Sequence, residues 1–378
     1  MAHSADREGQ VHLNGKTILI RRAQDKLRRR VRQLVGKPDN SPWVFDPRPA
    51  KRTADVDFVF ALDYCSPNSR LMKLFHEAMS AYGLSCQLVN ETNVQRMLEE
   101  VEAGRFGPNV YLDLSSRPDD VFEKLLYAAH RAGAITMRNP EHTKWVLKSQ
   151  SHPTLLAAGL PLPPTVILKS GEPDRELTAE ERAAIGERAV IKPSFGEAAK
   201  GCLVDVEPTL QNIRQARDYE RRFDWLIQKM ITWTKLGERP AYLRAYNVCG
   251  HRTLMWWAME KRPNPYELLS WNDLRKYDLM GAVEIIDRVA EVTGMDFFST
   301  EIAITKESGP DRFVMIDYVN DQCDMDPTDN PYSPPEPFSR FVCQRLAEFT
   351  YRKKQGLPPP DYRGLFLLED QVPRMCQW

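Results

Sequence analysis

Three side chains in the last third of the chain carry the oxygen ligands that a hard cation prefers. Glu301 lies on one alternating apolar run, and Asp317 and Asn320 lie on the next, across a turn-rich segment at 306–311. Alternation around Gly and Pro predicts a β-hairpin. Antiparallel pairing would bring the three side chains together, and Mg²⁺ binds such a set when phosphates and water complete its shell. Solvated residues on an exposed sheet face would give the same pattern.

A second candidate for chemistry is the glycine-containing loop at 194–201, between predicted strands at 189–192 and 202–206. Lys192 ends the first strand, and Ser194, Gly196 and Gly201 lie in the loop. Glycines let backbone N–H groups approach an anion closely, so the loop is a phosphate-binding candidate. The G-x-x-x-x-G-K-[ST] spacing of a P-loop is absent. An ordinary hairpin turn is the alternative interpretation.

The elements that would position these residues begin at Asp55. Apolar strand runs alternate with amphipathic helices joined by short loops, at 56–62, 68–82, 86–89, 94–102, 110–114, 119–132 and 134–137. This alternation predicts an α/β domain with a parallel sheet. No G-x-G-x-x-G follows the first strand, which argues against a dinucleotide site there. One continuous helix is predicted at 141–158 and a capping box at Thr178 and Glu181.

Composition is that of a globular protein with several lobes. The chain has 378 residues, of which 42% are hydrophobic and 28% charged, and its formal net charge is zero. Residues 1–54 hold 13 Lys/Arg against 5 Asp/Glu, a local charge of +8 that the remainder balances. Their amphipathic basic helix at 23–36 is typical of a solvated face docked by one apolar edge, and nucleic-acid or anionic-membrane binding is the alternative.

The seven cysteines are scattered and form no C-x-x-C pair, so they indicate neither a zinc site nor a disulfide framework. No apolar run reaches the ~18 residues of a membrane span, and no signal-peptide pattern is visible at the N-terminus. These features predict a cytoplasmic location.

The order of these parts resembles the ATP-grasp superfamily, which includes D-alanine–D-alanine ligase, glutathione synthetase and the glutamate ligases that modify a ribosomal protein. The resemblance covers roughly residues 55–349. It is carried by six motifs in the expected order, namely NPEHTKWVLKSQSHPTLLAAGLPLPPT, VIKPSFGEAAKGC, WLIQKMI, YLRAYNV, STEIAI and MIDYVND. Each motif is weak alone, and the ordered set is far more specific.

The resemblance implies an ATP-dependent carboxylate–amine ligase, with ATP and Mg²⁺ (or Mn²⁺) as cofactors and a homodimer as a compatible assembly. Lys148, with Lys144 as the fallback, and Lys192 would bind phosphates under the 194–201 loop. The residues that would surround adenine are Gln228, Lys229, Met230 and Ile231. The catalytic arginines would be Arg244 and Arg262, and the metal ligands Glu301, Asp317 and Asn320.

The same resemblance implies five segments. They are a basic extension at 1–54, a pre-ATP-grasp domain at 55–138, a small lobe with the lysines and phosphate loop at 139–230, a large lobe with the metal site at 231–350, and a tail at 351–378 that lies on the surface from 357.

Two departures from the family pattern bear on the reaction. The family usually spaces its last carboxylate and Asn two residues apart, whereas Asp317 and Asn320 are three apart, so a bulge is needed or Tyr318 takes the carboxylate position. Many amide ligases carry an Arg where this chain has Ser299, so Arg244, Lys261 or Arg262 would supply that charge. A small-molecule kinase and a non-catalytic ATP-binding module are therefore the alternative functions.

Overall fold

The computed structural model describes residues 55–117, 120–138, 143–196, 199–257, 266–306, 309, 311–327, 333–358 and 364–367. The predicted basic helix near the N-terminus lies outside these residues. The chain divides into two compact units. Unit 1 contains Lys144–Thr232 and Val314–Ile316, and unit 2 contains the other described residues.

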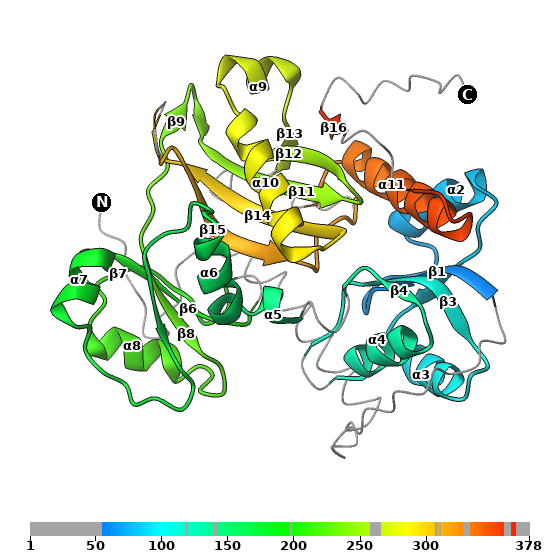
Figure 1. The fold of residues 1–378 in the computed structure, drawn as a ribbon, viewed down its shortest axis with the longest axis horizontal. Coiled ribbons are helices and arrows are strands. Elements are labelled where there is room, and N and C mark those ends of the chain that lie inside the picture. The colour runs from blue at the N-terminus through cyan, green and yellow to red at the C-terminus, as the bar shows by residue number, and fades with distance from the viewer. Residues whose placement is uncertain are drawn as a thin grey trace. The chain divides into compact units, whose positions relative to one another are not determined.

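Unit 2 begins with the predicted parallel sheet, whose strand order is β2-β1-β3-β4. The strands are β1 (Asp55–Ala61), β2 (Cys86–Val89), β3 (Gly107–Asp113) and β4 (Ile135–Thr136), and every pair is parallel. Helices α2 (Arg70–Ala81) and α11 (Glu336–Lys354) cover one face, and α3 (Val94–Glu102) and α4 (Val121–Arg131) cover the other (Figure 1). The sequence prediction of an α/β fold is confirmed.

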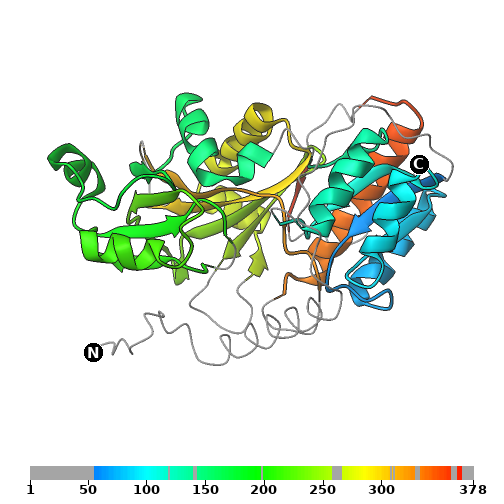
Figure 2. The same cartoon turned by 90° about the horizontal axis from the view of Figure 1, so that it is seen from below.

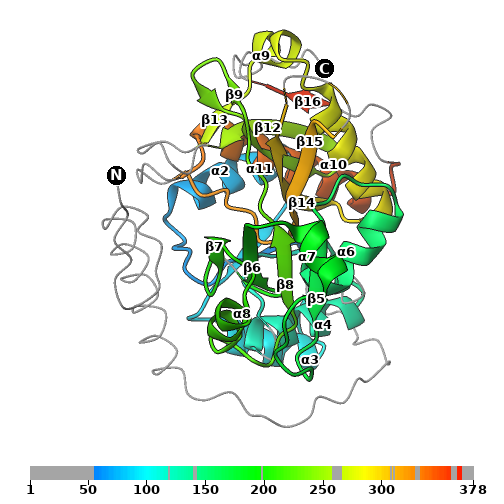
Figure 3. The ribbon, with the colours of Figure 1, turned by 90° about the vertical axis from the view of Figure 1, so that its left-hand side faces the viewer.

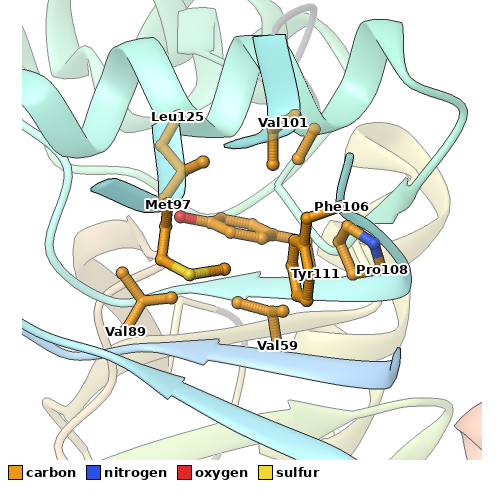
Figure 4. Close-up of a pocket in the computed structure, with 9 residues that line it drawn as sticks. Val59, Val89, Met97, Val101, Phe106, Pro108, Tyr111 and Leu125 are labelled. Carbon is orange, nitrogen blue, oxygen red and sulfur yellow. The ribbon is translucent and has the colours of Figure 1, made fainter. Parts of the chain in front are cut away.

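Alternation along β1 explains the two layers. Phe58 and Phe60 belong to the core with α2 and α11, whereas Val59 and Ala61 belong to the core with α3 and α4. Figure 2 views the molecule from the α3 and α4 side. Beneath these helices, Tyr111 lies among apolar side chains that leave no room for water (Figure 4). This region is packed core rather than a binding pocket.

A second sheet in unit 2 is mostly antiparallel and has the order β13-β12-β11-β14-β15. Its strands are β11 (Tyr242–Val248), β12 (His251–Trp257), β13 (Tyr266–Leu268), β14 (Phe297–Ile304) and β15 (Phe313–Asn320). Helix α10 (Met280–Thr293) packs on β11 and β12, and α9 (Trp271–Lys276) precedes it. A small hairpin joins β9 (Lys235–Leu236) and β10 (Arg239–Pro240).

The tail prediction is wrong in one part. Residues 364–367 do not simply lie on the surface, because β16 (Leu365–Phe366) pairs in parallel with β12. The Phe366 ring stacks on Phe341 of α11 at 4.3 Å between centroids. This ring contact joins residues 25 positions apart, and the proline-rich composition of the tail gave no sign of it.

Unit 1 is a four-stranded antiparallel sheet in the order β5-β8-β6-β7. The strands are β5 (Thr165–Leu168), β6 (Ala189–Pro193), β7 (Leu203–Val206) and β8 (Trp225–Lys229). Helices α7 (Ala179–Ile185) and α8 (Leu210–Arg217) pack on it around the fully buried Trp225 (Figure 3). Both hydrogen bonds of the predicted Thr178–Glu181 capping box are present.

The single helix predicted at 141–158 is instead two helices. Helix α5 (Thr143–Val146) ends before Leu147, which is extended, and α6 (Lys148–Ala157) begins after it. The N–H groups of Lys148 and Ser149 donate to the carbonyl and hydroxyl oxygens of Ser194 at 2.9 and 3.0 Å. These bonds to a distant loop satisfy the first N–H groups of α6. Helical periodicity alone does not predict that the helix begins there.

None of the helices in the described residues is both long and apolar enough to cross a membrane.

Candidate active site

The strongest cluster of polar side chains in unit 2 lies on one face of β11 and β14. The strand register places Arg244 opposite Glu301. The Arg244 guanidinium donates through Nη1 to Glu301 Oε1 at 2.8 Å, and the Tyr242 hydroxyl donates to Glu301 Oε2 at 2.5 Å. Both oxygens of this carboxylate are therefore held in place, while each keeps a further lone pair for another ligand.

Arg244 also reaches position 299. Its Nε and Nη2 atoms lie 3.3 and 3.2 Å from Ser299 Oγ, and its guanidinium carbon lies 4.8 Å from the centroid of the Trp257 ring. The side chain is only 7% exposed. Burial alone would lower the pKa of Arg244. The neighbouring groups, Glu301 among them, raise this pKa above its usual value. A fixed, desolvated positive charge can stabilise an anionic transition state strongly.

Asp317 lies on β15, the strand next to β14, and the Thr300 hydroxyl donates to its carbonyl oxygen at 2.7 Å. Burial raises the pKa of Tyr242, and the negative charges of Glu301 and Asp317 raise it further. Asp317 is partly exposed, whereas the Tyr318 side chain is fully buried. Successive strand residues point to opposite faces. The partly exposed Asp317, rather than the buried Tyr318, is therefore the candidate carboxylate at this end of β15.

Asn320 does not join these carboxylates in the same way. It ends β15 three residues after Asp317, a spacing that puts the two side chains on opposite faces of a regular strand. Its Oδ1 accepts the N–H of Gln322 at 3.1 Å. In the described residues, no group of three or more His, Cys, Asp or Glu could hold a metal ion. Two carboxylates still fit Mg²⁺, which keeps several waters and binds substrate phosphates.

The two predicted phosphate lysines lie in unit 1. Lys192 is 8% exposed, and its Nζ donates to the carbonyl oxygen of Ile316 at 2.7 Å. The buried His152 lies near it on α6, and burial together with the Lys192 charge lowers the His152 pKa to about 4. Because His152 is neutral at physiological pH, Lys192 carries the positive charge of this pair.

Ser194 connects the elements that carry the two lysines. It follows β6, which bears Lys192, and binds the first residues of α6, which begins at Lys148. Its hydroxyl donates to Ser149 Oγ at 2.8 Å, and Ser194 is only 2% exposed. The predicted fallback, Lys144, lies on α5 with its ammonium 4.8 Å from the Trp145 ring centroid. Sequence analysis missed Ser149, whose only signal is its place next to Lys148.

The loop at 194–201 contains a backbone conformation that residues other than glycine rarely adopt. Gly201 has φ of +72°, and a Cβ there would lie 2.5 Å from the Tyr219 ring. At Gly196 a Cβ would lie 3.2 Å from the Pro193 side chain. Residues 197 and 198 lie outside the described chain. The glycines thus let the loop turn closely over neighbouring side chains.

We expect Gly201→Ala to destabilise unit 1 by roughly 1–2 kcal/mol from the left-handed backbone alone, with the Tyr219 clash adding to it. Urea denaturation followed by Trp fluorescence measures this change. Gly171→Ala is the matched control, since a Cβ there meets nothing within 4 Å. Equal stability of the two variants would contradict the prediction.

The predicted adenine segment spans the end of β8 in unit 1 and the two residues after it. The buried Gln228 donates to Thr165 Oγ1 at 3.3 Å, and the N–H groups of Lys229 and Met230 donate to the carbonyls of Pro164 and Arg188. Within the described chain, the Ile231 N–H has no backbone acceptor. An N–H of this kind can donate to a ring nitrogen of a purine.

The remaining predicted arginine, Arg262, falls with Lys261 in 258–265, outside the described residues. The structure also adds Tyr242 on β11 and Trp257 on β12, which sequence analysis did not assign to the site.

Comparison with solved structures defines the class of fold. The chain is similar to ATP-grasp ligase PsnB complexed with minimal precursor, Mg and ADP, at 14% identity and a TM-score of 0.53, covering 79% of this chain and 98% of that one. It is also similar to an ATP-grasp RimK domain protein from Sphaerobacter thermophilus, at 16% identity and a TM-score of 0.53, covering 77% and 98%.

A third similar structure is the D-alanine–D-alanine ligase from Bacillus anthracis complexed with ATP, at 12% identity and a TM-score of 0.52, covering 80% of this chain and 99% of that chain. No protein-family model matches the sequence, and no curated protein is similar to it at the sequence level. The chain has the ATP-grasp fold, as its sequence predicted.

Proposed function

We propose that this protein is an ATP-dependent ligase that joins a carboxylate to an amine. The observation that carries the proposal is the buried Arg244, fixed by Glu301 and Ser299 on β14, next to the strand that carries Asp317, on a chain with the ATP-grasp fold. ATP is the phosphoryl donor, and Mg²⁺ supplies charge neutralisation on its phosphates.

Each unit carries its own set of proposed residues. From unit 1, Lys148 and Lys192 bind phosphate oxygens, and the N–H of Ile231 donates to the adenine. From unit 2, Glu301 and Asp317 are the metal ligands, and Asn320 is a third, weaker candidate. PsnB and the D-alanine–D-alanine ligase were solved with Mg and ADP or with ATP, which supports this choice of nucleotide and ion.

The reaction has two steps. A substrate carboxylate oxygen attacks the γ-phosphorus of ATP, ADP leaves, and an acyl phosphate forms. An amine then attacks the carbonyl carbon, inorganic phosphate leaves, and the nitrogen loses a proton to give the amide. Arg244 offsets the negative charge that develops on the acyl phosphate. It reaches position 299 from the neighbouring strand, where related ligases carry an arginine and this chain carries Ser299.

We expect hydroxylamine to trap the acyl phosphate as a hydroxamate when the protein turns over ATP with a carboxylate substrate. The PsnB structure contains a precursor, so peptides bearing Asp or Glu belong in the set of acids tested. Mass spectrometry detects the hydroxamate, and the Glu301→Ala/Asp317→Ala variant is the inactive control. ATP consumption with a stable phosphorylated alcohol and no hydroxamate would identify a kinase instead. ATP binding without consumption across these acids and amines would identify a non-catalytic module.

A cytoplasmic location and a homodimer remain predictions from the sequence and the resemblance.

A further inference from the structure

A buried group of three charges lies at the carboxyl edge of the parallel sheet in unit 2. Asp113 ends β3, Arg138 follows β4, and Asp321 comes directly after β15. Arg138 Nη1 lies 3.0 Å from Asp321 Oδ2 and 3.8 Å from Asp113 Oδ2. The three side chains are 4%, 9% and 0% exposed in the order Arg138, Asp321 and Asp113.

Hydrogen bonds hold the chain segments next to these charged residues. Asp113 Oδ1 accepts the N–H groups of Ser115 and Ser116, both at 3.0 Å. The Gln322 side chain donates through Nε2 to the Ser116 carbonyl at 2.5 Å. The segment after β15 is therefore joined to the segment after β4 by an ion pair and to the loop after β3 by a hydrogen bond. These contacts are made by the first and second residues after Asn320.

This arrangement is better suited to placing a chain segment than to stabilising the fold. Burial raises the pKa of Asp113, and the charge of Arg138 opposes that rise only in part. Two carboxylates share one guanidinium, and a buried ionic group of this kind is often no more stable than a well-packed apolar one. What the ion pair does provide is placement, because it holds the Asp321 carboxylate 3.0 Å from a buried guanidinium whose other carboxylate neighbour is Asp113.

We propose that Arg138 is a positioning residue for the metal ligands of β15, acting through Asp321. Asp321 is four residues beyond Asp317 and adjacent to Asn320, so the ion pair holds the end of the strand that carries both. Partners that orient metal ligands without touching the metal typically contribute 10- to 100-fold to its affinity. This inference rests on the proposed metal site.

The test compares ADP binding to the full-length protein over a titration of MgCl₂. We expect Asp321→Asn to raise the Mg²⁺ concentration at half-maximal enhancement of ADP binding by about 10-fold or more. Affinity for ADP in EDTA should stay unchanged, since the phosphate lysines are in unit 1. Arg138→Lys keeps the charge but loses the planar fork, so it should give a smaller shift in the same direction.

Arg217→Met is the matched control, because Arg217 is 1% exposed and pairs with Asp174 at 2.8 Å in unit 1. It should lower the melting temperature without moving the Mg²⁺ midpoint. An equal shift in this control, or no shift in Asp321→Asn, would overturn the inference. If Asp321→Asn does not fold, a wild-type midpoint in Arg138→Lys overturns it.

Asp317→Asn separates the inference from the proposed function. A large Mg²⁺ shift in Asp317→Asn with none in Asp321→Asn refutes only the positioning role. No shift in Asp317→Asn refutes the metal site itself, and the inference fails with it.

Discussion

Replacing Lys192 with alanine is expected to lower ATP turnover by about 100- to 1,000-fold, the loss seen when one preorganised donor is deleted from an active site. Lys192 is suited to this role because it is nearly buried and its ammonium is fixed on the Ile316 carbonyl at 2.7 Å. A desolvated ammonium binds a phosphate oxygen more strongly than an exposed one. Coupled-enzyme measurement of ADP release gives the rate.

The control removes a positive charge from unit 1 without removing a buried group. Arg182 forms an exposed ion pair with Glu176, so Arg182→Ala should leave ATP turnover close to that of the wild type. Measuring ADP affinity beside turnover shows whether Lys192 acts mainly in binding or mainly in the transition state. Wild-type turnover by Lys192→Ala would remove this lysine from the site.

The sequence carried enough information for the elements that depend on local pattern. Helix α3 begins and ends where periodicity predicted, at Val94 and Glu102, and the Thr178 capping box forms as expected. The break before Lys148 was not predictable, because it depends on hydrogen bonds to Ser194, 45 residues away in the case of Ser149. Local pattern predicts a helix, but the partners of its first N–H groups come from the tertiary structure.

The candidate site shows the same difference between what local pattern predicts and what tertiary contacts decide. The sequence placed Glu301 on a strand and the resemblance selected Arg244, but only the register between β11 and β14 reveals that they form an ion pair, 57 residues apart. The contact of Arg244 with Ser299 is a consequence of that same register. Residue types predicted which chemistry was available, and strand pairing determined which groups share a face.

This register leads to the second major prediction, on Arg244 itself. Arg244→Ala should abolish hydroxamate formation and destabilise unit 2 by about 3–5 kcal/mol, because it leaves the Glu301 carboxylate without its buried partner. Loss of activity in this variant alone would therefore not separate catalysis from folding. A compensating variant is needed that returns the charge from a different strand.

Ser299→Arg provides that variant, since Ser299 Oγ lies 3.2 Å from Arg244 Nη2 and an arginine side chain from position 299 starts on the same sheet face. We expect the double variant Arg244→Ala/Ser299→Arg to recover hydroxamate formation at least 10-fold over Arg244→Ala, because a guanidinium beside Glu301 is restored. Ser299→Lys in the same background is the matched control, and it should recover less, because an ammonium lacks the planar fork that Arg244 uses to contact Glu301 and Ser299 together. Recovery of stability without recovery of activity would show that Arg244 supports only the fold.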